Sequence, residues 1–215
     1  CMDLVENMIQ ETAEKVEALN VDWGGMNIDL SKNFERKSFL ELLKEATGHD
    51  LGNVNEDQLR KVCKEKDVAV RDNDNYGQML DELMSQLVEP HLIKPTFVID
   101  YPKATSPLAK AHRNGDPNLV ERFELFIGGA EFANSFSELN DPVDQRKRLE
   151  AQAALKERGD EEAQPVDENF IQAMECGMPP TGGVGIGIDR LTMLLTGNRW
   201  IKDVILFPAL RPENL

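Results

Sequence analysis

The sequence predicts an α+β fold in which helices flank an antiparallel sheet. Helical and strand-like segments occur in separate runs and do not alternate as regular βαβ units. Two strand patterns meet at Gly128-Gly129, which is a hairpin signal. A further strand pattern at 182–188 alternates glycine with branched residues and leads into a helix pattern at 190–196.

The first ninety residues consist mainly of helix patterns. The apolar stripe of the first helix, 2–18, is formed by Leu4, Met8, Ile9, Thr12, Val16 and Leu19. A strand-like stretch at 21–30 follows and is interrupted by Gly24-Gly25. Further helix patterns lie at 37–46, 56–66 and 77–87. Asn55 is a good N-cap for the second of these. Residues 31–90 together predict a helical insertion with polar, turn-rich joints.

Strand patterns dominate from Pro95 onward. The predicted strands are 96–99, 120–127, 130–138, 182–188 and 204–207. The predicted helices are 142–158, 170–176 and 190–196, with glycines 177 and 197 after the last two. Polar loops are predicted at 101–116 and, with an acidic composition, at 159–166.

Composition excludes several functional classes. A formal net charge of −15 over 215 residues argues against strong, nonspecific binding of DNA or RNA. No apolar run is long enough to span a membrane, and the start lacks the pattern of a signal peptide. The cysteines at 1, 63 and 176 show no paired spacing, so neither a disulfide framework nor a zinc site is supported. We therefore expect a cytoplasmic protein.

The glycine-rich strand predicts a surface that something approaches closely. Glycines at 183, 185 and 187 alternate with branched residues, which leaves bare backbone on one face of the strand. A planar ring could lie on that floor, and the guanidinium of Arg190 could stack on the ring or bind phosphate. A dinucleotide fingerprint would need glycine where Arg190 stands. Tight packing of a helix over the strand is the alternative explanation.

The hairpin brings two carboxylates together. If Gly128-Gly129 form a two-residue turn, Glu131 pairs with Phe126 and lies on the same face as Glu124. Carboxylates at that separation suit Mg²⁺ held between phosphate oxygens. A three-residue turn would change the pairing, and an exposed strand with solvated carboxylates is the alternative.

The second hairpin strand carries three further candidates. Asn134, Phe136 and Glu138 share one face among themselves, but their parity differs from that of Glu131. A β-bulge near Phe132-Ala133 is therefore required for all of them to line one site.

These motifs resemble the class II aminoacyl-tRNA synthetases. The run Gly-Ile-Gly-Ile-Asp-Arg at 185–190 is similar to their third signature motif, and Asn-Ser-Phe-Ser-Glu-Leu-Asn-Asp at 134–141 resembles the bacterial lysyl enzymes. Supporting stretches lie at 93–97, 101–102, 106–109, 177–181, 204–208 and 211–212. The resemblance is strong over 93–212 and weaker over 1–92. Aspartyl and asparaginyl relatives share the third motif but not the Asn-x-Phe-x-Glu strand.

For the amino-acid site, the resemblance implies lysine as substrate. Asn134 would help to place it, Phe136 would pack along its side chain, and Glu138 would face its ammonium group. A buried carboxylate opposite a cation makes a charge-assisted bond that neutral amino acids cannot make.

For the nucleotide site, the resemblance implies ATP held through magnesium. Glu124 and Glu131 would bind the Mg²⁺ ion, and Gly185 and Gly187 would form the floor near adenosine. Arg190 would stack on adenine and reach the terminal phosphate. Glu131 and Arg190 would be the catalytic residues, acting by positioning and charge stabilisation.

As a whole, the resemblance implies ATP-dependent activation of lysine, transfer to tRNA(Lys), and a homodimer. The family's Phe-Arg-x-Glu motif, its first motif and its anticodon-binding barrel have no match here. We therefore expect residues 1–215 to be part of a class II catalytic domain and inactive alone. Two alternatives stay open: a synthetase-like paralogue that lysylates a protein such as elongation factor P, and a non-catalytic binding module derived from a synthetase.

Overall fold

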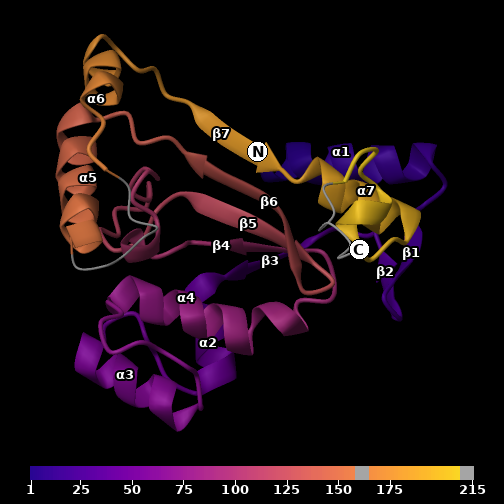
Figure 1. Ribbon diagram of the computed structural model, residues 1–215, viewed down its shortest axis with the longest axis horizontal. Helices are drawn as coiled ribbons and strands as arrows, with labels where there is room; N and C mark the ends of the chain where they lie inside the picture. Colours follow the sequence, from indigo (N-terminus) through magenta and orange to yellow (C-terminus); the bar gives the residue numbers. More distant parts are fainter. Residues whose placement is uncertain (158–164, 209–215) are drawn as a thin grey trace, which may run out of the picture.

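A computed structural model describes residues 1–157 and 165–208 and confirms an α+β fold (Figure 1). The helices are α1 (Met2–Lys15), α2 (Phe39–Thr47), α3 (Glu56–Glu65), α4 (Tyr76–Leu87), α5 (Pro142–Glu157), α6 (Glu168–Glu175) and α7 (Ile188–Thr196). The strands are β1 (Asn20–Trp23), β2 (Met26–Asp29), β3 (Glu35–Ser38), β4 (Thr96–Ile99), β5 (Arg122–Ile127), β6 (Ala130–Ser137) and β7 (Gly182–Ile186). Single 3-10 turns lie at Glu89–His91 (η1), Lys103–Thr105 (η2) and Ile201–Asp203 (η3).

The central sheet has the strand order β3-β4-β5-β6-β7. All neighbours are antiparallel except β3 and β4, which pair in parallel. Strand β3 lies within residues 31–90, where the sequence indicated helices and joints only. Its sequence, Glu-Arg-Lys-Ser, is mostly exposed at the edge of the sheet and has no apolar alternation that could indicate a strand.

Two N-terminal predictions were wrong in detail. The single interrupted strand at 21–30 is a hairpin, because Gly24 and Gly25 both take positive φ angles, 66° and 86°, that suit a tight turn. In α1 the buried side chains are Val5, Ile9 and Ala13, whereas Leu4 and Val16 of the predicted stripe are exposed. The helix packs along an i, i+4, i+8 line, and a small alanine completes the buried face.

The sheet separates two hydrophobic cores (Figure 1). On one face, α1 and α7 pack against side chains such as Phe123 and Leu125 of β5. On the other, α2, α3 and α4 pack over Val98 and Phe126. The capping boxes at Asn55 and Asn75 satisfy backbone N–H groups where α3 and α4 begin. Helices α2, α3 and α4 lie over one part of this face, and the candidate site lies beside them on the same face.

The C-terminal strand prediction was wrong. Val204–Phe207 forms bends after η3 and pairs with no described strand. Leu206 and Phe207 are about nine-tenths exposed. An apolar run forms a stable strand only when it can pair with a neighbouring strand. The predicted strand at 182–188 ends at Ile186, and α7 begins at Ile188 instead of 190. The predicted acidic loop at 159–166 lies largely outside the described residues.

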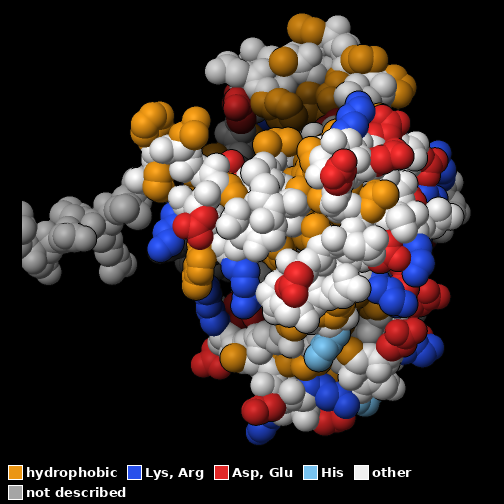
Figure 2. Space-filling view, turned by 90° about the vertical axis from the view of Figure 1, so that its right-hand side faces the viewer, with side chains coloured by type: hydrophobic (Ala, Val, Ile, Leu, Met, Phe, Trp, Pro, Cys, Tyr) orange, Lys and Arg blue, Asp and Glu red, His pale blue; other side chains and the backbone are white. Residues whose placement is uncertain are grey.

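The surface beside α1 and α7 carries charges of both signs. Figure 2 shows Lys and Arg side chains interspersed with Asp and Glu on this face, without a continuous basic patch. Hydrophobic side chains are also exposed around α7, among them Ile188, Trp200 and Ile201. None of the helices within the described ranges combines the length and hydrophobicity that crossing a bilayer requires.

Candidate active site

The β5–β6 hairpin has the predicted register. Gly128 and Gly129 form the turn with φ angles of 60° and 77°, and Phe126 faces Glu131. The register then shifts, because Leu125 pairs with Ala133 and leaves Phe132 as the extra residue. This is the β-bulge required by the sequence. It brings Glu131 to the face on which the following strand residues also lie.

Beyond the bulge, two rows of paired residues cross the sheet on that face. The rows are Glu124–Asn134–Gly185 and Arg122–Phe136–Gly183. The two glycines leave the backbone of β7 bare beside Asn134 and Phe136, as the alternating pattern predicted. Behind the sheet, α7 packs through Leu191 and Leu194, so the helix does not cover the glycine face. The structure thus favours an open floor over the packing alternative.

Glu124 lies at the centre of a hydrogen-bond network. Its Oε2 accepts from the Tyr101 hydroxyl at 2.7 Å. Its Oε1 accepts from Asn134 Nδ2 at 3.0 Å and from the Arg122 guanidinium at 2.5 Å. Each carboxylate oxygen can accept two hydrogen bonds, and among the described residues Tyr101 alone donates to Oε2, so this oxygen has capacity for one more partner. Glu124 is therefore held in one orientation and can still bind one further cation.

Arg122 is a site residue that the sequence analysis missed. Its Nη1 donates to the Thr105 carbonyl at 3.0 Å and to the Ser106 hydroxyl at 2.8 Å, and its guanidinium lies 4.6 Å from the centre of the Tyr101 ring. The side chain is only 17% exposed, so these contacts are largely shielded from water. Arg122 lies two residues before Glu124 on β5 and therefore shares its strand face, and this spacing could have identified it from the sequence. Its partners in the 101–106 loop could not be read from the sequence.

Glu131 and Arg190 meet at the bulge. The Arg190 guanidinium donates to the backbone carbonyl of Glu131, and its side chain is otherwise exposed. Burial, and secondly the charge of Glu124, raise the pKa of the Glu131 carboxyl. Glu89 of η1 extends the acidic group. Its pKa is raised to about 6 by burial and by the charges of Glu124 and Glu131. Burial is the main cause of both raised pKa values and repulsion between the carboxylates adds to it, so a bound cation would favour the ionised form of these groups.

Glu138 follows the end of β6 and lies over Gly183. A Cβ atom added to Gly183 would stand 2.0 Å from Oε1 of Glu138, so the carboxylate occupies the space that the missing side chain leaves. The backbone N–H of Glu138 donates to the Thr181 carbonyl at 2.9 Å, which fixes the main chain. Burial raises the pKa of its carboxyl, and within the described ranges no side chain is a hydrogen-bond partner of that group. A partly desolvated carboxylate of this kind suits a cationic ligand.

Comparison with known proteins agrees with this geometry. Residues 1–211 match the family described as tRNA synthetases class II (D, K and N). The chain belongs to this family. Among its relatives are proteins named lysine–tRNA ligase from Staphylococcus epidermidis, 49% identical over 99% of the chain, and from Staphylococcus saprophyticus, 50% identical over 99%. A lysine–tRNA ligase of Porphyromonas gingivalis is 45% identical over the whole chain.

The chain spans less than half of the length of these relatives. It covers 43% of each staphylococcal protein and 37% of the Porphyromonas protein. The predicted Glu124, Glu131, Asn134, Phe136 and Gly185 all lie on one face of its sheet. Glu138, Gly187 and Arg190 lie just beyond the ends of β6 and β7, where these strands enter the next segments.

Two carboxylates of the candidate site could hold a metal ion together with ligands that the protein does not supply. Among the residues that the structure describes, no group of three or more His, Cys, Asp or Glu side chains could enclose a metal ion. Glu124 and Glu131 could hold a Mg²⁺ ion that takes its remaining ligands from water and phosphate oxygens, as this ion commonly does. Burial, and secondly the charge of Glu124, raise the pKa of Glu131, and a bound cation would favour the ionised form of both carboxylates.

Proposed function

We propose that this chain contributes the lysine- and ATP-binding face of a lysine–tRNA ligase. The observation that carries the proposal is the position of Glu138 over Gly183, at the end of the strand face that carries Asn134 and Phe136. Its carboxylate is partly desolvated, and the described side chains do not neutralise it. A lysine ammonium group supplies the missing charge, whereas the neutral amide of asparagine and the acid of aspartate do not.

In this proposal the reaction begins with activation of the amino acid. The lysine carboxylate attacks the α-phosphate of ATP, lysyl-adenylate forms and pyrophosphate leaves. Asn134 and Phe136 hold the lysine, and Gly185 and Gly187 lie beneath adenosine. Arg190 stacks on adenine and contacts the terminal phosphate. These groups act by alignment and by electrostatic stabilisation of the transition state.

Glu124 and Glu131 would hold the magnesium, which supplies positive charge to the phosphates of ATP when it is bound. Tyr101 and Arg122 keep Glu124 in the orientation that leaves one lone pair free. Arg190 already meets the main chain of Glu131, so its guanidinium is close to the proposed phosphates.

The second step would transfer the lysyl group to tRNA(Lys). We further propose that the protein acts as a homodimer in the cytoplasm, as the family assignment suggests. Local contacts must hold the tRNA, because a net charge of −15 gives these residues little general attraction for phosphate backbones.

A segment exchange tests the proposal. Residues 1–215 would replace the matching segment of the Staphylococcus saprophyticus lysine–tRNA ligase, and amino-acid-dependent ATP–pyrophosphate exchange would be measured with lysine, asparagine and aspartate. We expect exchange with lysine only. A chimera that melts cooperatively and responds to asparagine or aspartate would contradict the lysine assignment, as would one that responds to none of the three.

A further inference from the structure

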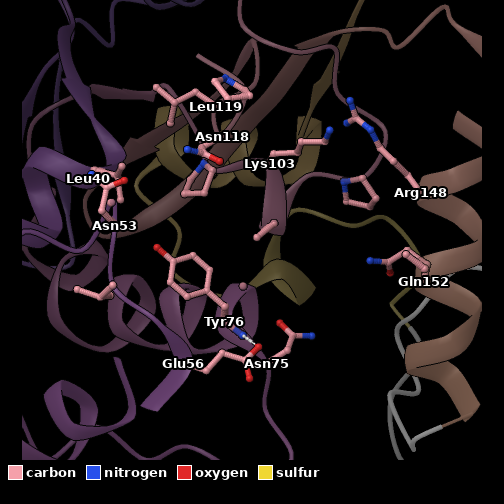
Figure 3. Close-up of a pocket in the computed structure, with 18 residues that line it drawn as sticks. Leu40, Asn53, Glu56, Asn75, Tyr76, Lys103, Asn118, Leu119, Arg148 and Gln152 are labelled. Atoms are coloured by element: carbon pink, nitrogen blue, oxygen red, sulfur yellow. Dashed lines mark hydrogen bonds between the residues drawn. The ribbon is translucent and has the colours of Figure 1, made fainter. Parts of the chain in front are cut away.

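A second cavity of about 770 Å³ lies away from the candidate active site, between the insertion helices and α5 (Figure 3). This volume is within the range of small-molecule binding sites. One wall is formed by Asn53 and Tyr76 of the insertion, another by the segment 102–107, and a third by Arg148 and Gln152 of α5. None of the residues assigned above to lysine, ATP or magnesium lines it.

The charge of this cavity contrasts with that of the whole chain. Its charged lining residues are Lys103, Arg148 and a single acid, Glu56, although the chain carries a net charge of −15. In Figure 3 the side chains of Lys103 and Arg148 extend toward each other at one end. Both lower the pKa of the Asp144 carboxyl, Arg148 more strongly, so both cations lie close to that group. Arg148 forms an ion pair with Asp144 at 2.6 Å, so the positive charge in excess at this end of the cavity comes from Lys103.

Arg148 shows an unmet hydrogen-bonding requirement at this end. Its side chain is more than nine-tenths buried. Nη1 donates to the Ala109 carbonyl at 2.7 Å and Nη2 to Asp144 at 2.6 Å. The Nε–H is buried, and no described residue is its hydrogen-bond partner. This Nε–H is closed off from the cavity, so a ligand there would meet the side of the guanidinium group that lines the space.

The rest of the cavity suits a planar or apolar body. The Tyr76 hydroxyl donates to the Leu51 carbonyl at 2.6 Å, which fixes the ring at the cavity wall. Amide side chains of Asn75 and Gln152 also line the space. The N-terminus of α4, a helix of 12 residues, opens into it at Asn75–Gly77, and its dipole adds positive potential.

We propose that this cavity binds a small organic anion, with its carboxylate or phosphate group against Lys103 and Arg148 and its body beside Tyr76. The inference stands on the cavity alone and does not depend on the proposed synthetase reaction. A small molecule is favoured over a nucleic acid because the cations are confined to one end of the cavity and do not form a track for a phosphate backbone.

The test uses the 215-residue chain and phenyl phosphate as the probe, followed by calorimetry and by backbone amide NMR shifts. We expect saturable binding in about the millimolar range, as befits so small a ligand. The shifted amides should be those near Tyr76, Lys103 and Gln152. Phenol, which lacks the anionic group, should bind at least about tenfold more weakly.

The matched variants are Lys103→Gln and Lys64→Gln, which remove the same charge from the cavity and from the exposed surface of α3. Only Lys103→Gln should weaken binding, by about tenfold, and both should melt as the unsubstituted chain does. Equal weakening in both variants, or equal affinity for phenol, would overturn the proposal. So would shifts confined to the Gly185 region, or tighter binding of a short single-stranded RNA than of phenyl phosphate.

Discussion

Substitution of Gly183 by alanine should damage lysine recognition without unfolding the protein. The new Cβ atom would stand 2.0 Å from Oε1 of Glu138, whereas contacts under 3.0 Å essentially do not occur. The carboxylate oxygen must therefore move by about 1 Å. The atom that must move is at the end of a flexible side chain, and Gly183 does not have a positive φ angle, so the backbone can accept the alanine. Replacing glycine where the backbone is compatible changes stability by only about 0.4–1 kcal/mol, in the stabilising direction.

The functional cost follows from that displacement. An error of 1 Å in the position of a binding group can lower the rate by about 10²-fold. We therefore expect Gly183→Ala in the chimera to lower kcat/KM for lysine by about two orders of magnitude. The KM for ATP should change little, because the nucleotide is proposed to lie over Gly185 and Gly187.

Gly185→Ala is the matched control in the same strand. Its Cβ atom would meet the Asn134 carbonyl at 3.7 Å, an ordinary contact, so Glu138 stays in place. The methyl group would instead stand on the proposed adenosine floor and raise the KM for ATP. Steady-state pyrophosphate exchange with each substrate varied in turn measures both effects. The reasoning is refuted if Gly183→Ala leaves kcat/KM for lysine unchanged, or if the two variants affect the two substrates equally.

Three further predictions concern single carboxylates. Glu138→Gln should lower kcat/KM for lysine by about 10²-fold or more. The ammonium group of the bound lysine would lose its partner, and breaking a buried ion pair costs about 3–5 kcal/mol. Near-normal pyrophosphate exchange would contradict the assignment. Glu124→Ala and Glu131→Ala should each raise the Mg²⁺ concentration needed for exchange. The control Glu121→Ala removes a carboxylate bound to Arg113 and Ser137 and should leave the Mg²⁺ requirement unchanged. Unchanged Mg²⁺ titrations for Glu124→Ala and Glu131→Ala would show that these residues do not bind the metal. Glu89→Gln should raise Tm near pH 8 but not near pH 4. The raised pKa of Glu89, about 6, means that its ionised form opposes folding above that pH, and a Tm gain independent of pH would show another cause.

The local part of the site could be predicted from the sequence. Gly128-Gly129 indicate the hairpin turn, and period-two alternation then places Phe126 opposite Glu131. The parity conflict between Glu131 and Asn134 even required the bulge at Phe132 that the structure contains. Such features depend on neighbours within a few residues, which is why a sequence pattern encodes them.

Other features depend on partners far along the chain. Strand β3 could not be predicted, because its charged residues carry no period-two pattern and its partner in the described sheet, β4, begins about sixty residues later. The run Val204–Phe207 has a strand composition but finds no edge to pair with in the described fold. A strand is stabilised by its neighbours, so composition alone decides neither case.

The sequence by itself determined the fold class and the strand register of the candidate site, since glycine spacing and strand alternation are local properties of the chain. Only the tertiary structure decided that Arg122 and Tyr101 hold Glu124 and that Glu138 fills the space over Gly183. It alone also brought Lys103 and Arg148 to one end of a second cavity. The physical reason is that hydrogen bonds and packing act between atoms a few ångströms apart, and the residues concerned lie on segments that the fold joins and the sequence separates.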